Sequence, residues 1–319
     1  MREREGKKLR LGVSACLLGQ EVRYDGGHKR DAFLTETLGP FVEWVPVCPE
    51  VEIGLGIPRA TLRLVGGATA PRLVAEKTGE DLTARMRRYA EAKLGELAAL
   101  GLDGYVLKRA SPSCGLFRVR VYRARGAPAR AGRGLYARAL VARFPLLPVE
   151  EEGRLADPAI RDNFLERVWA AARWRAFLAT APRRGDLVAF HAAQELALLA
   201  HSPARLTRLG RLVATPGPLT RARLARYGAR FMETLAVGAT RARHAEALRR
   251  LAGVLARVLD ATARAELARL IREYRRGRVP LRVPLTLARR YVRRLDLRDL
   301  AAQSYLDPHP HELLPREHV

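Results

Sequence analysis

The chain is poor in cysteine: its 319 residues contain three, at positions 16, 48 and 114. An odd number cannot be used up in disulfide pairs, and so few cysteines do not make a disulfide framework. We therefore exclude a small disulfide-stapled extracellular scaffold. Metal binding, catalysis and simple burial remain as uses for the three thiols.

The sequence also lacks a long apolar run. No stretch approaches the roughly 20 apolar residues that a membrane-spanning helix needs, although 48% of the residues are hydrophobic. Residues 1–10 are mostly charged and contain no apolar signal core. We expect a soluble, cytoplasmic protein of about two domains that has no membrane partner.

Lysine is scarce, since only six of the 58 basic residues are lysines and the rest are arginines. The formal net charge is nevertheless +25. Arginine favours bidentate contacts with phosphate groups. A charge of this size predicts a polyanionic partner such as nucleic acid. The alternative is a basic surface that faces only solvent.

The first half of the chain alternates between apolar runs and helical patterns. Apolar runs with β-branched residues predict strands within 8–16, 43–50, 103–114 and 118–122. Helical spacing of apolar residues predicts helices at 29–38 and 79–100. Strands that alternate with helices form parallel sheets. We therefore expect an α/β domain over residues 1–150, with a Rossmann-like parallel sheet.

The second half of the chain is predicted to be all-α. A linker is expected at 143–164, which contains three prolines and an acidic turn. Amphipathic patterns then predict helices at 165–178, 186–200, 219–236, 241–259 and 261–276. Prolines 280 and 284 are expected to break helices, and 301–315 forms a proline-rich cap. The second domain, 151–319, is thus a helical domain.

Each cysteine stands at or just beyond the end of a predicted strand. The carboxyl ends of parallel strands meet at one edge of the sheet, where ligands bind in open α/β folds. Cys16, Cys48 and Cys114 are therefore expected to lie together. Soft thiolates suit zinc, copper(I) or iron–sulfur clusters, and three separated donors suit a [4Fe-4S] cluster with one open iron. Buried, inert cysteines are the alternative.

Polar residues accompany two of the cysteines. Glu50 follows Cys48 by two residues, which places a carboxylate beside the expected site. Ser111 and Ser113 precede Cys114. Each of these residues also has a structural interpretation: Glu50 could pair with an arginine at a strand end, and the serines could shape a turn.

The segment 23–31, between the first two cysteines, is charged and glycine-containing. Its Gly26-Gly27 pair permits close backbone approach. Asp25 and Lys29 are candidate substrate- or phosphate-binding residues. A turn aspartate and a surface lysine are equally good interpretations of the same two positions.

Three motifs together resemble a known family. "SACLLGQEVRYDGGHKRD", "CPEVEIGLGIPR" and "KRASPSCG" look like the motifs of the thiouracil desulfidase (TudS-like) family, in order and over roughly residues 8–150. The C-terminal half resembles a helical domain of unknown function that is often fused to it. Gln194-Glu195 and Arg250 depart from that second pattern. The two-domain combination is similar to the tRNA 4-thiouridine desulfidases.

The resemblance implies a [4Fe-4S] cluster held by Cys16, Cys48 and Cys114. It implies non-redox, hydrolytic removal of sulfur from 4-thiouridine in tRNA, which gives uridine and sulfide. The chemistry needs a base to activate water, for which Glu50 is the candidate, and a hydrogen-bond donor or acid, for which Ser111 is the candidate.

Further expectations concern substrate binding. Asp25, Lys29 and Ser113 are expected to bind substrate, although Ser113 also suits a role in shaping the loop. Arginine stripes at 221–230, 241–250 and 289–298 are expected to contact the tRNA backbone.

Two alternative functions stay open. The first is desulfurisation of free thiolated bases such as 2-thiouracil, which would not require so basic a chain. The second is a non-enzymatic RNA-binding protein with an iron–sulfur sensor, which would not need Glu50 and Ser111 together. The sequence leaves the oligomeric state open.

Overall fold

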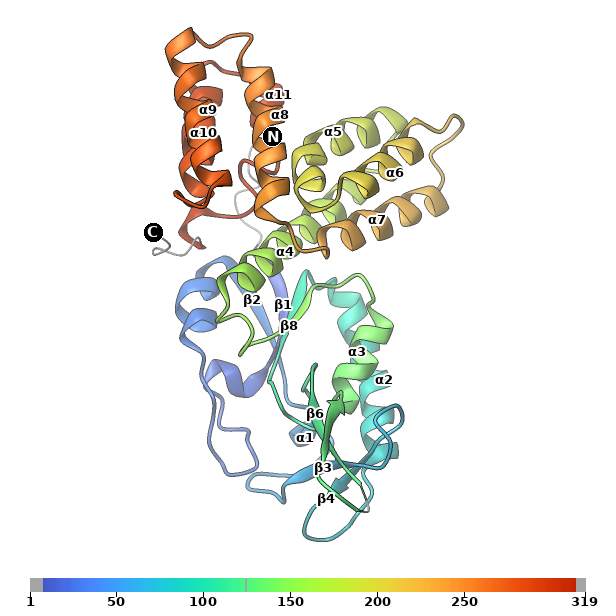
Figure 1. The fold of residues 1–319 in the computed structure, drawn as a ribbon. Helices are drawn as coiled ribbons and strands as arrows, with labels where there is room; N and C mark the ends of the chain where they lie inside the picture. The colour runs from blue at the N-terminus through green and yellow to red at the C-terminus, as the bar shows by residue number, and fades with distance from the viewer. Residues whose placement is uncertain (1–7, 124, 314–319) are drawn as a thin grey trace. The chain divides into compact units, whose positions relative to one another are not determined.

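The computed structural model describes residues 8–123 and 125–313. They form two compact units, the first up to Ala171 and the second from Ala172 onward (Figure 1). The division falls inside a long helix, α4 (Pro158–Leu178). Residues 151–171, which we assigned to the helical domain, therefore group with the α/β unit. The start of the chain and its last six residues lie outside the described ranges.

A four-stranded parallel sheet forms the centre of the first unit. Its strands are β1 (Leu9–Ser14), β2 (Val42–Val47), β5 (Gly104–Leu107) and β8 (Val149–Glu151). The spatial order is β2-β1-β5-β8, and every pairing is parallel. The predicted α/β class with a parallel sheet is thus confirmed.

The packing of β1 depends on a glycine. Gly12 pairs with Tyr105 of β5, and a β-carbon at Gly12 would lie 2.2 Å from the Tyr105 ring. Tyr105 is fully buried, and its hydroxyl lies 3.2 Å from that of Tyr136. The small residue therefore lets a large aromatic ring from the neighbouring strand fill the core.

A second, mixed sheet completes the first unit. Its strands are β3 (Leu62–Val65), β4 (Arg72–Ala75), β6 (Val119–Tyr122) and β7 (Ala129–Gly132). Their order is β4-β3-β6-β7, with an antiparallel pair at each end. Only β6 was predicted. All four strands have only four residues, and β3, β4 and β7 were missed.

The helices of the first unit include several that were not predicted. They are α1 (Pro49–Glu52), α2 (Thr83–Leu100) and α3 (Leu135–Arg143), with η1 (Ala15–Leu18), η2 (Phe33–Leu38) and η3 (Gly39–Phe41). The predicted helix 29–38 is wrong for its first three residues. The predicted helix 79–100 starts only at Thr83, because Asp81 pairs with Val74 in a β-bridge.

The predicted linker at 143–164 is also wrong. This segment supplies β8, which pairs with β5, and the start of α4. The three consecutive acidic residues 150–152 suggested a solvated turn. In the structure Glu150 and Glu151 are buried, because their carboxylates accept internal hydrogen bonds.

The second unit is helical, as predicted. After α4 it contains α5 (Arg184–His201), α6 (Pro203–Ala214), α7 (Arg221–Leu235), α8 (Arg241–Leu255), α9 (Ala261–Arg275), α10 (Arg282–Arg294), α11 (Arg298–Ala301) and η4 (His311–Leu313). Helix α6 was missed. The predicted break at Pro284 is wrong, because this proline occupies the first turn of α10. Backbone amides in the first turn have no acceptor within the helix, so the missing amide proton of proline breaks no hydrogen bond there.

Caps and aromatic packing stabilise these helices. The side chains of Thr220, Thr240 and Asp260 accept hydrogen bonds from the third residue of the helix that follows each. Trp174 contacts four aromatic rings, those of Phe177, Phe190, Tyr227 and Phe231. Among the described residues, no helix is long and apolar enough to cross a lipid bilayer.

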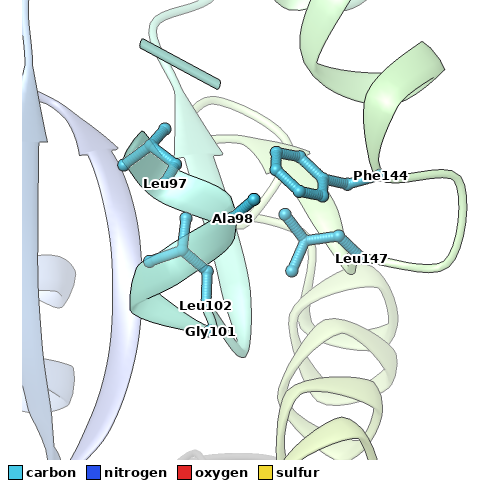
Figure 2. A pocket seen from close by; sticks show the side chains of 6 residues that line it. All are labelled: Leu97, Ala98, Gly101, Leu102, Phe144 and Leu147. Atoms are coloured by element: carbon cyan, nitrogen blue, oxygen red, sulfur yellow. The ribbon is translucent and has the colours of Figure 1, made fainter. Parts of the chain in front are cut away.

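A small apolar pocket lies between the end of α2 and the loop after α3 (Figure 2). Its volume is about 180 Å³, and it is lined by Leu97, Ala98, Gly101, Leu102, Phe144 and Leu147. Because α2 leads into the start of β5, this pocket is at the amino-terminal edge of the parallel sheet. It is therefore on the opposite edge from the cysteines and contains no reactive group.

The contact between β1 and β5 gives a stability prediction. Replacing Gly12 by Ala forces a methyl group into the Tyr105 ring, and such overpacking costs about 1–3 kcal/mol. The matched control is Gly95→Ala on α2, where a β-carbon meets nothing within 4 Å and the helix gains about 0.5–1 kcal/mol. Thermal unfolding should show a lower Tm for Gly12→Ala and an equal or higher one for Gly95→Ala. Equal Tm values for Gly12→Ala and the unaltered chain would contradict this packing.

Candidate functional site

The three cysteines follow three neighbouring strands of the parallel sheet. Cys16 lies in η1 directly after β1, and Cys48 directly follows β2. Cys114 stands in the loop after β5, the other neighbour of β1. All three thiols are free of disulfide bonds, and Cys16 and Cys114 are buried. The predicted positions at one sheet edge are those observed.

The thiols are close enough to influence one another electrostatically. Burial and, to a smaller extent, the neighbouring Cys48 raise the pKa of Cys16 to about 11, while Lys108 and Arg23 act in the opposite direction. Burial also raises the pKa of Cys114 well above its usual value, with added contributions from Cys48 and Cys16. Each thiol is thus part of one shared electrostatic environment.

Ser14, the last residue of β1, connects the end of this strand to the segment after β5. Its Oγ accepts a hydrogen bond from the backbone amide of Lys108 at 2.9 Å. The same hydroxyl hydrogen-bonds the Cys114 side chain, which lowers the pKa of that thiol against the larger effect of burial. Ser14 is 3% exposed. It was not identified from the sequence, where it reads as one more small residue of a buried strand.

Glu50 lies at the centre of a hydrogen-bonded group. Its Oε2 accepts hydrogen bonds from Nε and Nη2 of Arg59, at 3.0 and 2.9 Å. Its Oε1 accepts one from the Ser113 hydroxyl at 2.9 Å. Arg59 also donates to the carbonyl of Val22 at 2.9 Å, and Cys48 Sγ lies 3.6 Å from that same carbonyl oxygen. Glu50 is therefore held in one orientation beside the thiols.

Ser111 and Ser113 have different roles. Ser111 Oγ accepts hydrogen bonds from the backbone amides of Ser113, at 3.2 Å, and Cys114, at 3.0 Å. It thus shapes the turn that carries Cys114, as the structural interpretation expected. Ser113 is fully buried and contacts Glu50. The assignment of Ser111 as an acid stays a prediction, but Ser113 is the serine that touches the carboxylate.

The Cys114 loop is tightly packed. A β-carbon on Gly115 would lie 2.7 Å from the Ser111 carbonyl oxygen, so only glycine fits there. The first amides of α3, those of Leu135 and Ala137, donate to the carbonyls of Pro112 and Ser113. The positive end of the α3 dipole therefore faces the loop, which favours negative charge near Cys114.

Acidic residues at the end of β8 hold the same loop. Glu151 Oε1 accepts hydrogen bonds from the backbone amides of Leu116, at 2.7 Å, and Phe117, at 3.1 Å. Glu152 pairs with Lys108 and accepts a hydrogen bond from the amide of Arg109 at 2.7 Å. Sequence reasoning missed these residues. A run of three carboxylates directly after an apolar segment is the signal that could have indicated them.

Asp25 and Lys29 lie on the exposed segment after η1. Asp25 Oδ1 accepts a hydrogen bond from the Gly27 amide at 3.2 Å and lies 3.4 Å from Arg23 Nε. The Gly27 hydrogen bond holds the pKa of Asp25 below its usual value. The backbone amide of Lys29 donates to the carbonyl of Cys16 at 2.9 Å. Both side chains are exposed, and their binding of substrate stays a prediction.

The donor set fits a polynuclear cluster. Thiols are soft ligands, and three of them converge from separate strand ends, as an iron–sulfur cluster requires. Within the described ranges, no group of three His, Cys, Asp or Glu side chains is arranged to hold a single metal ion. Lys108 and Arg23 lower the pKa of Cys16, and the Ser14 hydroxyl lowers that of Cys114, but the larger effect of burial raises the pKa of both thiols.

Comparisons with known proteins agree with this site. Residues 11–152 match the family model described as 2-thiouracil desulfurase. The uncharacterized protein YbbK of Bacillus subtilis is 31% identical over 108 residues, which are 32% of this chain and 71% of YbbK. The chain therefore belongs to the 2-thiouracil desulfurase family, and the resemblance inferred from the three motifs is confirmed.

Three further similarities were found. A solved structure described as a [4Fe-4S]-dependent thiouracil desulfidase is 39% identical, covers 47% of this chain and 94% of its own, and superposes with a TM-score of 0.40. Residues 196–310 match a family of unknown function, DUF1722. The uncharacterized protein YbgA of Escherichia coli K12 is 29% identical over 47% of this chain and 89% of its own.

Two residues that depart from the expected C-terminal pattern contact each other. Glu195 of α5 and Arg250 of α8 form an ion pair. Gln194 accepts a hydrogen bond from the Ser304 hydroxyl at 2.7 Å and is buried. These positions thus have structural partners within the helical unit.

The Glu151 contacts predict a specific effect on Cys114. Glu151→Ala leaves two amides without an acceptor, at about 1–3 kcal/mol for each buried donor, and the loop around Cys114 should open. Glu151→Gln keeps a carbonyl oxygen and is the matched control. We expect iodoacetamide to label Cys114 of the metal-free protein faster in Glu151→Ala than in Glu151→Gln, as followed by mass spectrometry. Equal labelling rates would show that Glu151 does not hold the loop.

Proposed function

We propose that this protein is a [4Fe-4S]-dependent desulfidase that removes sulfur from 4-thiouridine in tRNA. The reaction is hydrolytic: water adds its oxygen to the ring carbon, the carbon–sulfur bond breaks, and uridine and sulfide are released. No net electron transfer is needed. The observation that carries the proposal is the convergence of three free thiols, from three neighbouring strand ends, on a carboxylate with fixed orientation.

Cys16, Cys48 and Cys114 would hold the cluster. When bound through three thiolates, a [4Fe-4S] cluster supplies one iron with an open position, a soft Lewis acid that suits a thiocarbonyl sulfur. The sequence identity of 39% with a [4Fe-4S]-dependent thiouracil desulfidase supports this assignment.

The chain's own residues supply the proton chemistry. Glu50 would accept a proton from the attacking water, because its carboxylate lies beside the thiols. Arg59 holds Oε2 through two hydrogen bonds, and the Ser113 hydroxyl holds Oε1. These contacts fix the orientation of the carboxylate before substrate arrives. The hydroxyl proton of Ser111 is a candidate donor to the ring or to the leaving sulfur.

The choice of tRNA as substrate is supported by charge. Residues from 172 onward contain 29 arginines, no lysine and 12 acidic residues. A polyanionic substrate accounts for such a surface, whereas a small neutral base gains little from it. The name of the matched family favours the alternative, in which free 2-thiouracil is the substrate.

One experiment distinguishes these substrates. The protein is purified anaerobically, reconstituted with iron and sulfide, and incubated with bulk tRNA or with free 2-thiouracil. Digestion and mass spectrometry then quantify 4-thiouridine and uridine. We expect cluster-dependent loss of 4-thiouridine from tRNA. Intact cluster with no such loss would contradict the tRNA assignment, and conversion of 2-thiouracil alone would establish the alternative.

Replacement of Glu50 separates an enzyme from a sensor. Glu50→Ala should keep the iron content of the unaltered chain, because the thiols are unchanged, and should lose turnover by about 10²–10⁴-fold. Glu91→Ala, at an exposed position of α2, is the control. An iron–sulfur sensor that only binds RNA would show no effect of Glu50→Ala on any of its properties.

The two serines should differ in their effects. Ser113→Ala removes the hydrogen bond to Glu50 Oε1, so kcat should fall while iron content is retained. Ser111→Ala removes an acceptor for two backbone amides, so it should loosen the turn and lower both iron retention and kcat. Iron analysis and single-turnover rates on both variants test this. A larger loss of iron from Ser113→Ala than from Ser111→Ala would reverse the assignment.

A further inference from the structure

A basic groove lies between two helices of the second unit. Helices α6 and α7 form an antiparallel hairpin joined by residues 215–220 (Figure 1). The groove has a volume of about 410 Å³. Its lining residues are Arg205, Arg208, Arg226, Ala229, Arg230, Glu233 and Thr234. The lining thus contains four guanidinium groups and one carboxylate, and it carries a strong excess of positive charge.

Helical spacing places these arginines on one face of each helix. Arg205 and Arg208 are three residues apart on α6, and Arg226 and Arg230 are four apart on α7. The apolar residues of both helices, such as Leu209 and Phe231, are buried. Each helix of the hairpin therefore has an apolar face that packs in the core and a charged face that lines the groove.

Most of the groove arginines are not used to hold the fold together. Arg205 donates to the backbone carbonyl of Glu233 at 2.9 Å, which fixes one guanidinium across the groove. Arg208, Arg226 and Arg230 are exposed, and the described contacts pair none of them with a carboxylate.

Other arginines of the predicted basic stripes behave differently. Arg223 donates to the carbonyls of Leu212 and Val213. Arg243 donates to the carbonyl of His201 at 2.7 Å, and Arg289 pairs with Asp307 at 3.2 Å. These three residues tie helix ends and loops together. The stripes therefore contain structural arginines as well as those available to a ligand.

The chemistry of the groove indicates the type of ligand. Guanidinium groups bind phosphate oxygens through paired hydrogen bonds. Two facing pairs of guanidiniums suit successive phosphates of a chain. No aromatic ring and no amide side chain is among the lining residues, so the groove offers nothing that would stack on a base or read its edge.

We infer that the α6–α7 groove binds the phosphodiester backbone of RNA, with Arg208, Arg226 and Arg230 as phosphate contacts and Arg205 as the fixed anchor. The inference rests on the proposed function for the identity of the RNA as tRNA. It extends the tRNA contact to α6, which lies outside the arginine stripes predicted from the sequence, whereas Arg226 and Arg230 belong to the stripe at 221–230.

The test is RNA binding by the whole chain, which needs no active cluster. The triple variant R208Q/R226Q/R230Q is compared with R257Q/R269Q/R275Q, which removes three exposed arginines elsewhere in the same unit. Binding of labelled bulk tRNA is measured by fluorescence anisotropy over a range of salt concentrations. Circular dichroism confirms that both variants are folded.

We expect the groove variant to weaken tRNA binding by about tenfold or more, and to reduce the slope of log K against log salt by about two to three. The control variant should change affinity by less than about threefold and keep the slope within about one. Equal effects of the two variants would overturn the inference, because they would show only a general charge effect.

A competition arm distinguishes a backbone site from a nucleotide site. Millimolar UMP should leave tRNA bound, whereas displacement by UMP would overturn the backbone assignment.

Failure of the proposed function can be distinguished from failure of the groove assignment. If 4-thiouridine is not converted but the groove variant still loses RNA binding, the groove stands and the desulfidase assignment fails. If 4-thiouridine is converted but the groove variant binds tRNA normally, the groove assignment fails.

Discussion

The candidate site depends on the pairing of β1 between β2 and β5. Both pairings are parallel, with Ser14 opposite Val47 and Val13 opposite Val106. Chain segments that leave parallel strands emerge at the same sheet edge. This register therefore brings together three thiols that are far apart in sequence, the first and last being Cys16 and Cys114. A slip of one residue would turn every side chain of the strand to the opposite face.

Burial of charge is the second constraint on the site. A thiol in an apolar environment keeps its proton, and burial is the largest cause of the raised pKa of each cysteine. A metal that binds must replace those protons. The carboxylates of the site follow the rule that charges removed from water need partners. The partly buried Glu50 has Arg59 and Ser113, and the buried Glu151 has two backbone amides. The hydrogen bonds that offset the cost of removing these carboxylates from water also fix the geometry around the cysteines.

Part of this arrangement could be predicted from the sequence, because it follows from local patterns and one topological rule. The apolar run that forms β1, the amphipathic α2 and the meeting of three strand ends are of this kind. Strand β8 could not be predicted, because Glu150 and Glu151 are internal hydrogen-bond acceptors only in the folded chain. Ser111 and Ser113 could not be told apart either, since the path of a tight turn decides which hydroxyl reaches Glu50. In the helical unit, the sequence does not distinguish the arginines that line the α6–α7 groove from those that cap helix ends. The two groups differ in their hydrogen-bond acceptors, which only the structure shows.

The central claim is that Cys16, Cys48 and Cys114 hold one cluster. The most direct test measures iron and sulfide per chain after anaerobic reconstitution, in the unaltered protein and in the three single Cys→Ser variants. The account predicts about four irons per unaltered chain and a large loss in every variant, because each thiolate is one of three ligands. A variant that keeps the full iron content would contradict it, since that cysteine would then have no part in the site.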